Sequence, residues 1–392
     1  MTDTTHDLAT HDPEARAREI GPSLAQRADR IEAARTLPDD VVQDLLAADM
    51  FRTFIPAAYG GAETDILTGM AALTELGRWD GSTAWCVMIA NTTALLAGYL
   101  PPEHAETIYC DPRVITGGYT VPTGTARVVD GGLLVSGTWA WGSGTRHCTW
   151  IGGTVRLVDD DGNPTRRDDG LSTPYVFFEP DDIDFVDTWH VMGLAGTGST
   201  DFTTTDTFVP EGRWVQVAGA TPVVDGPLWR FPFFGMLAAG VASVAIGIAA
   251  GAVERFAELA PDKIPQGSSR PLAERAPAQA DLSRAEATVR SSRAYLDQAL
   301  GEAWEVATRG DPLTVEHRRL IRQAAADAAQ RCADSLVRLH RQAGGIGVYL
   351  SEPLQRAVRD SQVAATHGMV AERIHELTGR LLLGLDTDTG LL

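Results

Sequence analysis

The spacing of hydrophobic residues changes twice along the chain. Up to about residue 113, apolar residues recur at helical spacing, as in Ile31, Ala34 and Leu37. From about residue 114 to 217, short β-branched and aromatic runs alternate with Asp-Gly and Gly-Gly turns, which is typical of antiparallel strands. From Phe231 onward helical spacing returns. The pattern therefore predicts helices, then a β-domain, then helices.

These changes predict an α+β protein that is mainly α. We expect a disordered tail over residues 1–15, an N-terminal helical domain over 16–113, a middle antiparallel β-domain over 114–222 and a C-terminal four-helix bundle over 228–386. The tail contains acids and no apolar stretch, which excludes a secretory signal peptide.

Residues 231–253 form an uncharged segment long enough to span a membrane. Alanine and glycine dominate it, and no Lys/Arg cluster flanks it, so a helix buried inside a bundle is favoured over a membrane span. Gly247 and Gly251 are expected to let neighbouring helices approach closely.

Charge and cysteine content narrow the function. The formal net charge of −19 argues against a nucleic-acid or anionic-membrane partner, because both require a positive surface. The four cysteines show neither CxxC nor metal-ligand spacing, so no disulfide scaffold or zinc site is expected, and a reducing cytoplasm is the simplest location. The sequence also lacks a strand-to-helix GxGxxG, a P-loop, HExxH and GxSxG.

Several motifs resemble the acyl-CoA dehydrogenase fold over about residues 20–384. Pro38, Leu45, Leu46 and the segment IPAAYGG at 55–61 resemble its first helices, and QAGGIGVYLSEPLQRAVRD at 342–360 resembles its C-terminal signature. The segments at 135–150 and 187–201 are similar to the oxygenase components (group D) of two-component flavin-dependent monooxygenases.

The resemblance implies a reaction with oxygen. Such an enzyme uses FMNH2 or FADH2 from a separate NAD(P)H:flavin reductase, forms a C4a-hydroperoxyflavin with O2 as co-substrate, and hydroxylates a small, aromatic or natural-product molecule. No nicotinamide site is recognisable in this chain, so its electrons must come from the substrate or from another protein. A homotetramer is also implied. An acyl-CoA dehydrogenase-type desaturase with FAD, and a non-redox binding or lyase descendant of the scaffold, remain as alternatives.

Residues that match the family's flavin site follow the two glycine-rich motifs. Ser143 matches the serine near flavin N5, and Thr197 and Ser199 are expected to act from the second loop, where Gly196 and Gly198 permit close backbone approach. Trp139 and Trp141 are expected to face one side of a strand and to supply a wall for the ring, although core packing is the alternative. Turn capping is the alternative for Thr197 and Ser199.

His367 is the expected catalytic histidine, together with Ser143. The position that carries the dehydrogenase glutamate, counted from Arg359-Asp360, is Gly368 here, and His367 lies next to it. Its near-neutral pKa suits proton transfer, and helix capping is the alternative. Glu372, the nearest remaining carboxylate, keeps the dehydrogenase alternative open.

The remaining site residues are expected to lie around the substrate and around the flavin phosphates. Asn91-Thr92-Thr93 occupy the place of a second histidine found in many members of the branch, so Asn91 and Thr93 are assigned to the substrate pocket with His147. His147 is equally explained as a buried histidine bridging strands, and His190 is expected on a surface loop. The residues that match the family's region near the flavin phosphates or a neighbouring subunit's adenylate are Arg293, Arg341, Gln342, Gly344 and Gly345, and a solvated helix face is the alternative for Arg293.

Overall fold

The computed structural model describes residues 12–216, 220–390 and 392. Its first helix begins earlier than the boundary expected at residue 16. The Asp12 carboxylate accepts a hydrogen bond from the Ala15 N–H at 2.9 Å, and Pro13 occupies the first turn, so the helix begins at Pro13. The remainder of the expected tail, residues 1–11, lies outside the described residues. The N-terminal helices are α1 (Pro13–Ala34), α2 (Asp39–Ala47), α3 (Ile66–Trp79), α4 (Gly81–Ala94) and α5 (Pro102–Tyr109).

The middle of the chain forms one seven-stranded sheet with the order β5-β6-β2-β1-β3-β4-β7. The sheet is mixed rather than purely antiparallel, because β1 and β3 pair in parallel. β1 and β2 form a hairpin, and β3 then pairs with the opposite edge of β1, so its direction matches that of β1. The strands are β1 (Thr116–Val129), β2 (Gly132–Gly142), β3 (Trp150–Leu157), β4 (Tyr175–Phe178), β5 (Asp184–Val186), β6 (Thr200–Pro210) and β7 (Trp214–Val215).

The C-terminal helices are α6 (Phe233–Leu259), α7 (Ala276–Thr308), α8 (Val315–Ala343), α9 (Pro353–Ala365) and α10 (Arg373–Leu382). α6 has the length and mean hydropathy, 2.1, of a membrane span, yet 89% of its apolar window is buried inside the protein. A Cβ at Gly247 would lie 2.2 Å from the Thr74 carbonyl oxygen, and one at Gly251 would lie 2.2 Å from that of Arg78. The expected close approach of helices at these two glycines is confirmed.

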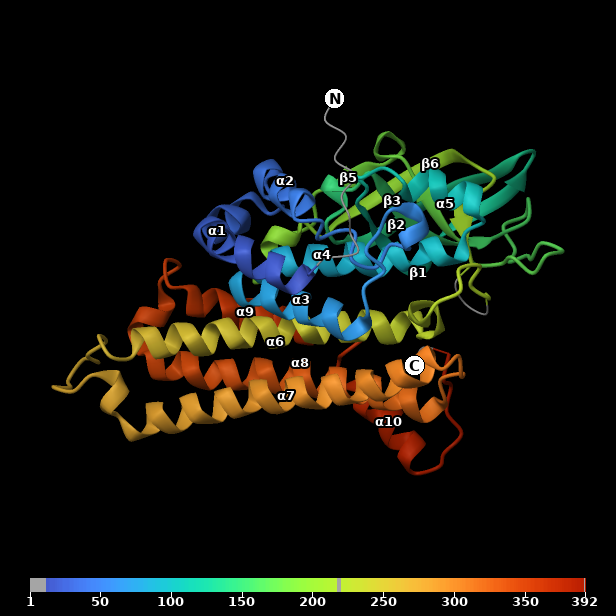
Figure 1. The fold of residues 1–392 in the computed structure, drawn as a ribbon. Helices are drawn as coiled ribbons and strands as arrows, with labels where there is room; N and C mark the ends of the chain where they lie inside the picture. Colours follow the sequence, from blue (N-terminus) through green and yellow to red (C-terminus); the bar gives the residue numbers. More distant parts are fainter. Residues whose placement is uncertain (1–11, 217–219, 391) are drawn as a thin grey trace.

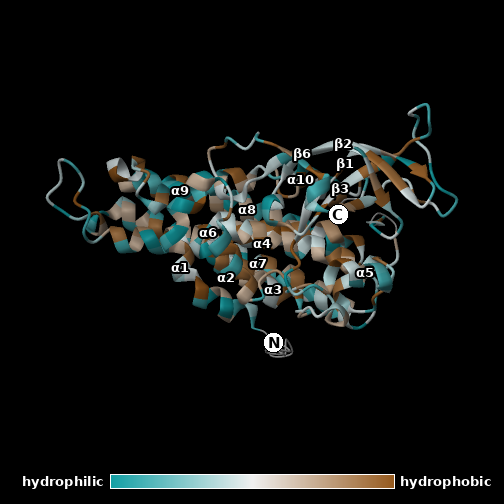
Figure 2. Cartoon of the chain, turned by 90° about the horizontal axis from the view of Figure 1, so that it is seen from above, coloured by the Kyte–Doolittle hydropathy of each residue, from teal (hydrophilic) through white to brown (hydrophobic). Residues whose placement is uncertain are grey.

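The three groups of elements meet around α4 (Figure 1). The sheet and the N-terminal helices lie over the layer of long C-terminal helices, and α4 packs against both β1 and α6. Viewed from above, the strands gather at one end and α1 and α9 lie towards the other (Figure 2). Asp80 caps α4 by accepting the Thr83 N–H at 2.7 Å, and nearly every residue of the helix is buried. The expected order of helices, sheet and helices is confirmed.

Candidate active site

Three buried hydroxyl groups from two glycine-rich loops touch one another. Ser143 follows β2, and its Oγ lies 2.7 Å from the Oγ of Ser199. The Ser199 Oγ lies 2.6 Å from the Oγ1 of Thr197, which donates to the Leu194 carbonyl oxygen at 2.8 Å. The Gly144 N–H donates to the Thr197 carbonyl oxygen at 2.9 Å and joins the two loops. The structure therefore brings together the three residues that the motifs assigned to one site.

The glycines of the second loop allow close packing against α1. A Cβ at Gly196 would lie 2.3 Å from Ile31 Cγ2, and one at Gly198 would lie 2.9 Å from the Arg35 carbonyl oxygen. Gly198 also has a φ of +54°, a conformation that glycine adopts at little cost. In the described chain, the close approach that these glycines permit is to α1 and Arg35, and close approach to a flavin stays a prediction.

Trp85 links the hydroxyl groups to His367. Its indole N–H donates to Ser143 Oγ at 3.1 Å, and its ring meets the His367 ring edge-on, with 5.4 Å between centroids and 75° between planes. The indole is buried in α4. Sequence reasoning missed Trp85 because it lies within an apolar helix. The available signal was that a buried tryptophan usually needs an acceptor for its N–H.

His367 is held as a neutral imidazole just beyond α9. Burial, and then the charges of Arg322 and Arg373, lower the pKa of His367 to about 4. Its Nδ1 accepts the Met369 N–H at 3.3 Å, so the ring proton resides on Nε2. The site therefore presents a neutral N–H donor at neutral pH rather than a cation.

His147 brings a second neutral imidazole close to the first loop. Both ring nitrogens are buried and have no hydrogen-bond partner among the described residues. Burial lowers the pKa of His147 to about 4, and Phe51 lies 6.2 Å away between ring centroids. Buried polar atoms are normally satisfied, so this imidazole fits beside a polar ligand or water. Bridging between strands, the alternative for His147, has no support in its contacts.

Trp139 and Trp141 do not form a common wall. Trp139 is fully buried in the sheet core, with its ring 5.2 Å from that of Phe202, whereas Trp141 is 60% exposed and meets Tyr119. The strand pairing shifts between Trp139 and Gly142, and Trp141 has a φ of +57°. This bulge breaks the alternation on which the prediction rested.

Asn91 and Thr93 are used within the protein core. The Asn91 amide donates to the carbonyl oxygens of Met50 and Val87 at 2.7 and 3.0 Å and accepts the Phe54 N–H at 3.3 Å. The Thr93 Oγ1 lies 2.7 Å from that of Thr116, and it also bonds to carbonyl oxygens of its own helix. Their hydrogen-bonding groups therefore fasten α4 to its neighbours, and their assignment to the substrate pocket stays a prediction that these contacts do not support.

Glu372 and His190 lie on the surface of the single chain. Glu372 is exposed immediately before α10, so it supplies no buried carboxylate within the single chain, and its assignment to the pocket stays a prediction. His190 lies in an exposed loop, 3.7 Å from the Asp187 carboxylate, as expected for a surface residue.

The residues expected near the flavin phosphates lie on the helical bundle. Arg293 pairs with Asp297 at 2.8 Å within α7, and Gln342 donates to Asp281 at 2.7 Å. Arg341, Gly344 and Gly345 are exposed at the end of α8, and a Cβ on either glycine would meet nothing within 4 Å. In one chain these residues do not contact the hydroxyl groups. No group of three or more metal-ligating side chains occurs within the part of the chain that the structure describes.

Comparisons with known proteins place this geometry in a family. Residues 16–101 match the N-terminal domain of acyl-CoA dehydrogenases, and residues 239–372 match the C-terminal domain. The indole-3-acetate monooxygenase of Pseudomonas putida is 29% identical over 368 residues, which cover 93% of this chain and 92% of that protein.

Two solved structures share the fold over nearly their whole length. XiaF from a Streptomyces species, in complex with FADH2 and glycerol, is 27% identical with a TM-score of 0.88, and the match covers 95% of each chain. The 3-HSA hydroxylase from Rhodococcus is 25% identical with a TM-score of 0.88, covering 97% of this chain and 99% of that one.

Proposed function

The chain belongs to the flavin-dependent monooxygenases of the acyl-CoA dehydrogenase superfamily, and we propose that it is the oxygenase component of a two-component system. A separate NAD(P)H:flavin reductase would supply its reduced flavin, and a small aromatic or natural-product molecule would receive one oxygen atom. An aromatic substrate is supported by the names of its relatives, which include an indole-3-acetate monooxygenase.

One observation favours oxygenation over dehydrogenation. The residue that contacts Trp85 at the end of α9 is a neutral histidine, His367, and the adjacent position is a glycine. Removal of a proton next to a carbonyl group requires a buried base such as a carboxylate. Glu372, the nearest carboxylate that follows, is exposed in the chain. The desaturase alternative is therefore not favoured.

The described residues fit a reduced flavin. The ring of such a cofactor is flat, with polar atoms along its edges, and needs a few aimed hydrogen-bonding groups beside apolar surface. Ser143, Thr197 and Ser199 provide buried hydroxyls, His147 provides ring nitrogens without a partner, and Trp141 provides exposed aromatic surface. Bound there, the flavin would supply the two electrons and the carbon that reacts with O2.

The protein's own residues would then control protons and water. The Nε2–H of His367 is a neutral donor that can hold a proton near the reacting oxygen without releasing it to solvent. The Trp85 ring shields one side of this imidazole, and α4 excludes water because it is buried nearly all round.

The flavin phosphates would bind across a subunit boundary. We assign Arg293, Arg341, Gln342, Gly344 and Gly345 to phosphate contacts of a neighbouring subunit in a homotetramer. In support, the segment that follows them exposes Val348, Tyr349 and Leu350 at 72%, 65% and 74%, a surface suited to a subunit contact. A cytoplasmic location completes the proposal. Either FAD or FMN is compatible with it.

The proposed function is tested by reconstitution with a flavin reductase, NADH, oxygen and indole as the probe substrate. We expect consumption of NADH and formation of a hydroxylated product that requires both proteins. A Glu372→Gln variant should retain this activity, because that carboxylate is exposed. A protein that instead purifies with oxidised flavin, which bleaches anaerobically on adding an acyl-CoA, would establish the desaturase alternative.

A further inference from the structure

The side chains of Ser143, Ser199 and Thr197 form a hydroxyl chain that runs from Trp85 to Leu194. The direction of every hydrogen bond in this hydroxyl chain follows from its two ends. At one end, Thr197 Oγ1 lies 2.8 Å from the Leu194 carbonyl oxygen. Two oxygen atoms at this distance require a proton between them, and a carbonyl oxygen has none to give. Thr197 therefore donates its single hydroxyl proton to Leu194.

The remaining protons are then fixed one by one. Since the Thr197 proton is used, Ser199 must donate across the 2.6 Å contact to Thr197. Ser143 must in turn donate across the 2.7 Å contact to Ser199. At the other end, Trp85 Nε1 can only donate, and it does so to Ser143 Oγ at 3.1 Å. Ser143 thus keeps one acceptor site and no proton for a ligand.

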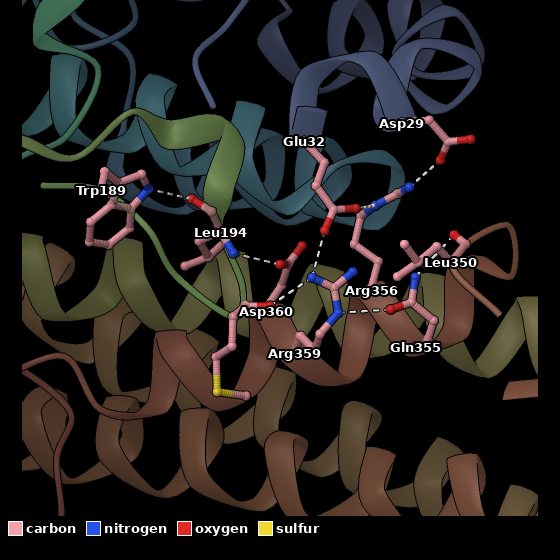
Figure 3. A network of polar contacts seen from close by, with 10 residues as sticks. Asp29, Glu32, Trp189, Leu194, Leu350, Gln355, Arg356, Arg359 and Asp360 are labelled. Carbon is pink, nitrogen blue, oxygen red and sulfur yellow. Dashed lines mark hydrogen bonds and ion pairs between the residues drawn. The ribbon is translucent and has the colours of Figure 1, made fainter. Parts of the chain in front are cut away.

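The Leu194 end of the chain is clamped to α9. The Leu194 N–H donates to the buried Asp360 carboxylate at 2.6 Å, and Trp189 Nε1 donates to the Leu194 carbonyl oxygen at 3.2 Å (Figure 3). Gly193 packs directly on α9, where a Cβ would lie 2.4 Å from the carbonyl oxygen of Arg359. The Leu194 carbonyl oxygen, the terminal acceptor, is therefore held in place, and this fixes the direction of the hydrogen bonds in the hydroxyl chain.

This direction matters because the flavin edge changes its hydrogen bonding on reduction. Oxidised flavin has only a lone pair at N5, whereas reduced flavin carries a hydrogen there. We propose that the ordered chain from Trp85 to Leu194 makes Ser143 an obligate acceptor and so selects reduced over oxidised flavin. Thr197 is the positioning residue that sets this direction. The inference rests on the proposed function, because it requires Ser143 to face the N5 edge.

The test compares the dissociation constants of oxidised and reduced flavin rather than turnover. Dissociation constants for oxidised flavin and for anaerobically reduced flavin are measured with the wild-type protein and with Thr197→Val. The valine cannot donate to Leu194, so Ser199 is free to donate to Ser143, and Ser143 is free to donate to the flavin. We expect the preference for reduced flavin to fall about tenfold, the effect of one hydrogen bond. Thr197→Ser keeps the hydroxyl and should restore the preference.

A second variant covers the case in which Thr197→Val does not fold. Ser199→Ala removes the acceptor of the Ser143 proton and should lower the preference for reduced over oxidised flavin to a similar extent. A preference within twofold of the wild-type value in the folded variants would overturn the inference while leaving the proposed function intact. A wild-type protein that binds no reduced flavin would overturn the proposed function itself.

Discussion

Because His367 is neutral in the folded protein, acidification should lower the stability of the fold. The imidazole has a pKa of 6.5 in its ordinary state and about 4 in the folded protein, chiefly because of burial. Between these values the unfolded chain binds a proton that the folded protein does not. Acidification therefore favours unfolding. The contribution of His367 is fully present above about pH 6.5 and is lost as the pH falls towards 4.

The size of the effect follows from this difference in pKa. At about 1.4 kcal/mol per pKa unit, the shift corresponds to about 3 kcal/mol of unfolding free energy. This figure is an upper value, because part of the His367 side chain is accessible to solvent. His147 and Asp360 titrate over overlapping ranges, so the wild-type profile alone does not isolate His367.

A comparison with His367→Asn isolates the contribution. Asparagine does not titrate, and its side-chain oxygen can accept the Met369 N–H in place of Nδ1. Urea unfolding, followed by circular dichroism, is measured for both proteins at about pH 7.5 and about pH 4.5, on either side of the ordinary pKa. We expect the stability of the wild-type protein relative to the variant to fall by 1 kcal/mol or more, and at most about 3 kcal/mol, on acidification.

A stability difference between the two proteins that is the same at both pH values would contradict this prediction. It would mean that His367 titrates normally and is solvated in the folded state. The pKa measured directly from the imidazole proton resonances serves as a control, and we expect it near 4. Because His367 stays neutral, product formation should also show no inflection from this residue near its ordinary pKa.

Substitutions at three further positions separate structure from function. Asn91→Ala should lower the unfolding free energy by about 3 kcal/mol, since it leaves buried backbone groups without partners, and should leave the Michaelis constant unchanged; a change in that constant alone would restore Asn91 to the substrate pocket. Asp360→Leu should increase hydrogen exchange at the Leu194 amide, and Asp360→Asn should not, because an amide oxygen still accepts; equal exchange in both would refute the clamp. Trp85→Phe removes the N–H donor to Ser143 and should weaken anaerobic binding of reduced flavin about fivefold, whereas an unchanged constant would show that the indole only packs.

The sequence predicts the order of elements and the meeting of the two glycine-rich loops. Hydrophobic spacing distinguishes the helical zones from the β-zone, because the two backbone periods differ. Ser143, Thr197 and Ser199 lie in recognisable motifs, so their proximity follows from the resemblance. The direction of β3 does not follow, because alternation marks a strand but not the edge at which it pairs.

Several site assignments depend on contacts that spacing does not encode. Trp85 lies in a helix that is hydrophobic all round, so no face of it is marked in the sequence as pointing to the site. Trp141 leaves its expected face because a bulge with positive φ follows Trp139. Asn91 looks available in the sequence, yet three core backbone groups use its amide.

Two buried carboxyl groups hold the site in position, and their burial lowers the stability of the folded protein. Asp80 caps α4, which carries Trp85, and Asp360 clamps Leu194, which ends the hydroxyl chain. Burial raises the pKa of both carboxyl groups, that of Asp360 to about 7. The contribution of Asp360 to stability is therefore lost as the pH rises from its ordinary range towards neutrality, and that of Asp80 changes in the same direction. This trend is opposite to that of His367. An apolar residue at either position would avoid the cost of burying a charge, but it would leave the Thr83 or the Leu194 N–H without its acceptor. Their presence where α4, α9 and the second loop meet is explained if the positions of Trp85 and of the hydroxyl chain matter more to this enzyme than the stability they cost.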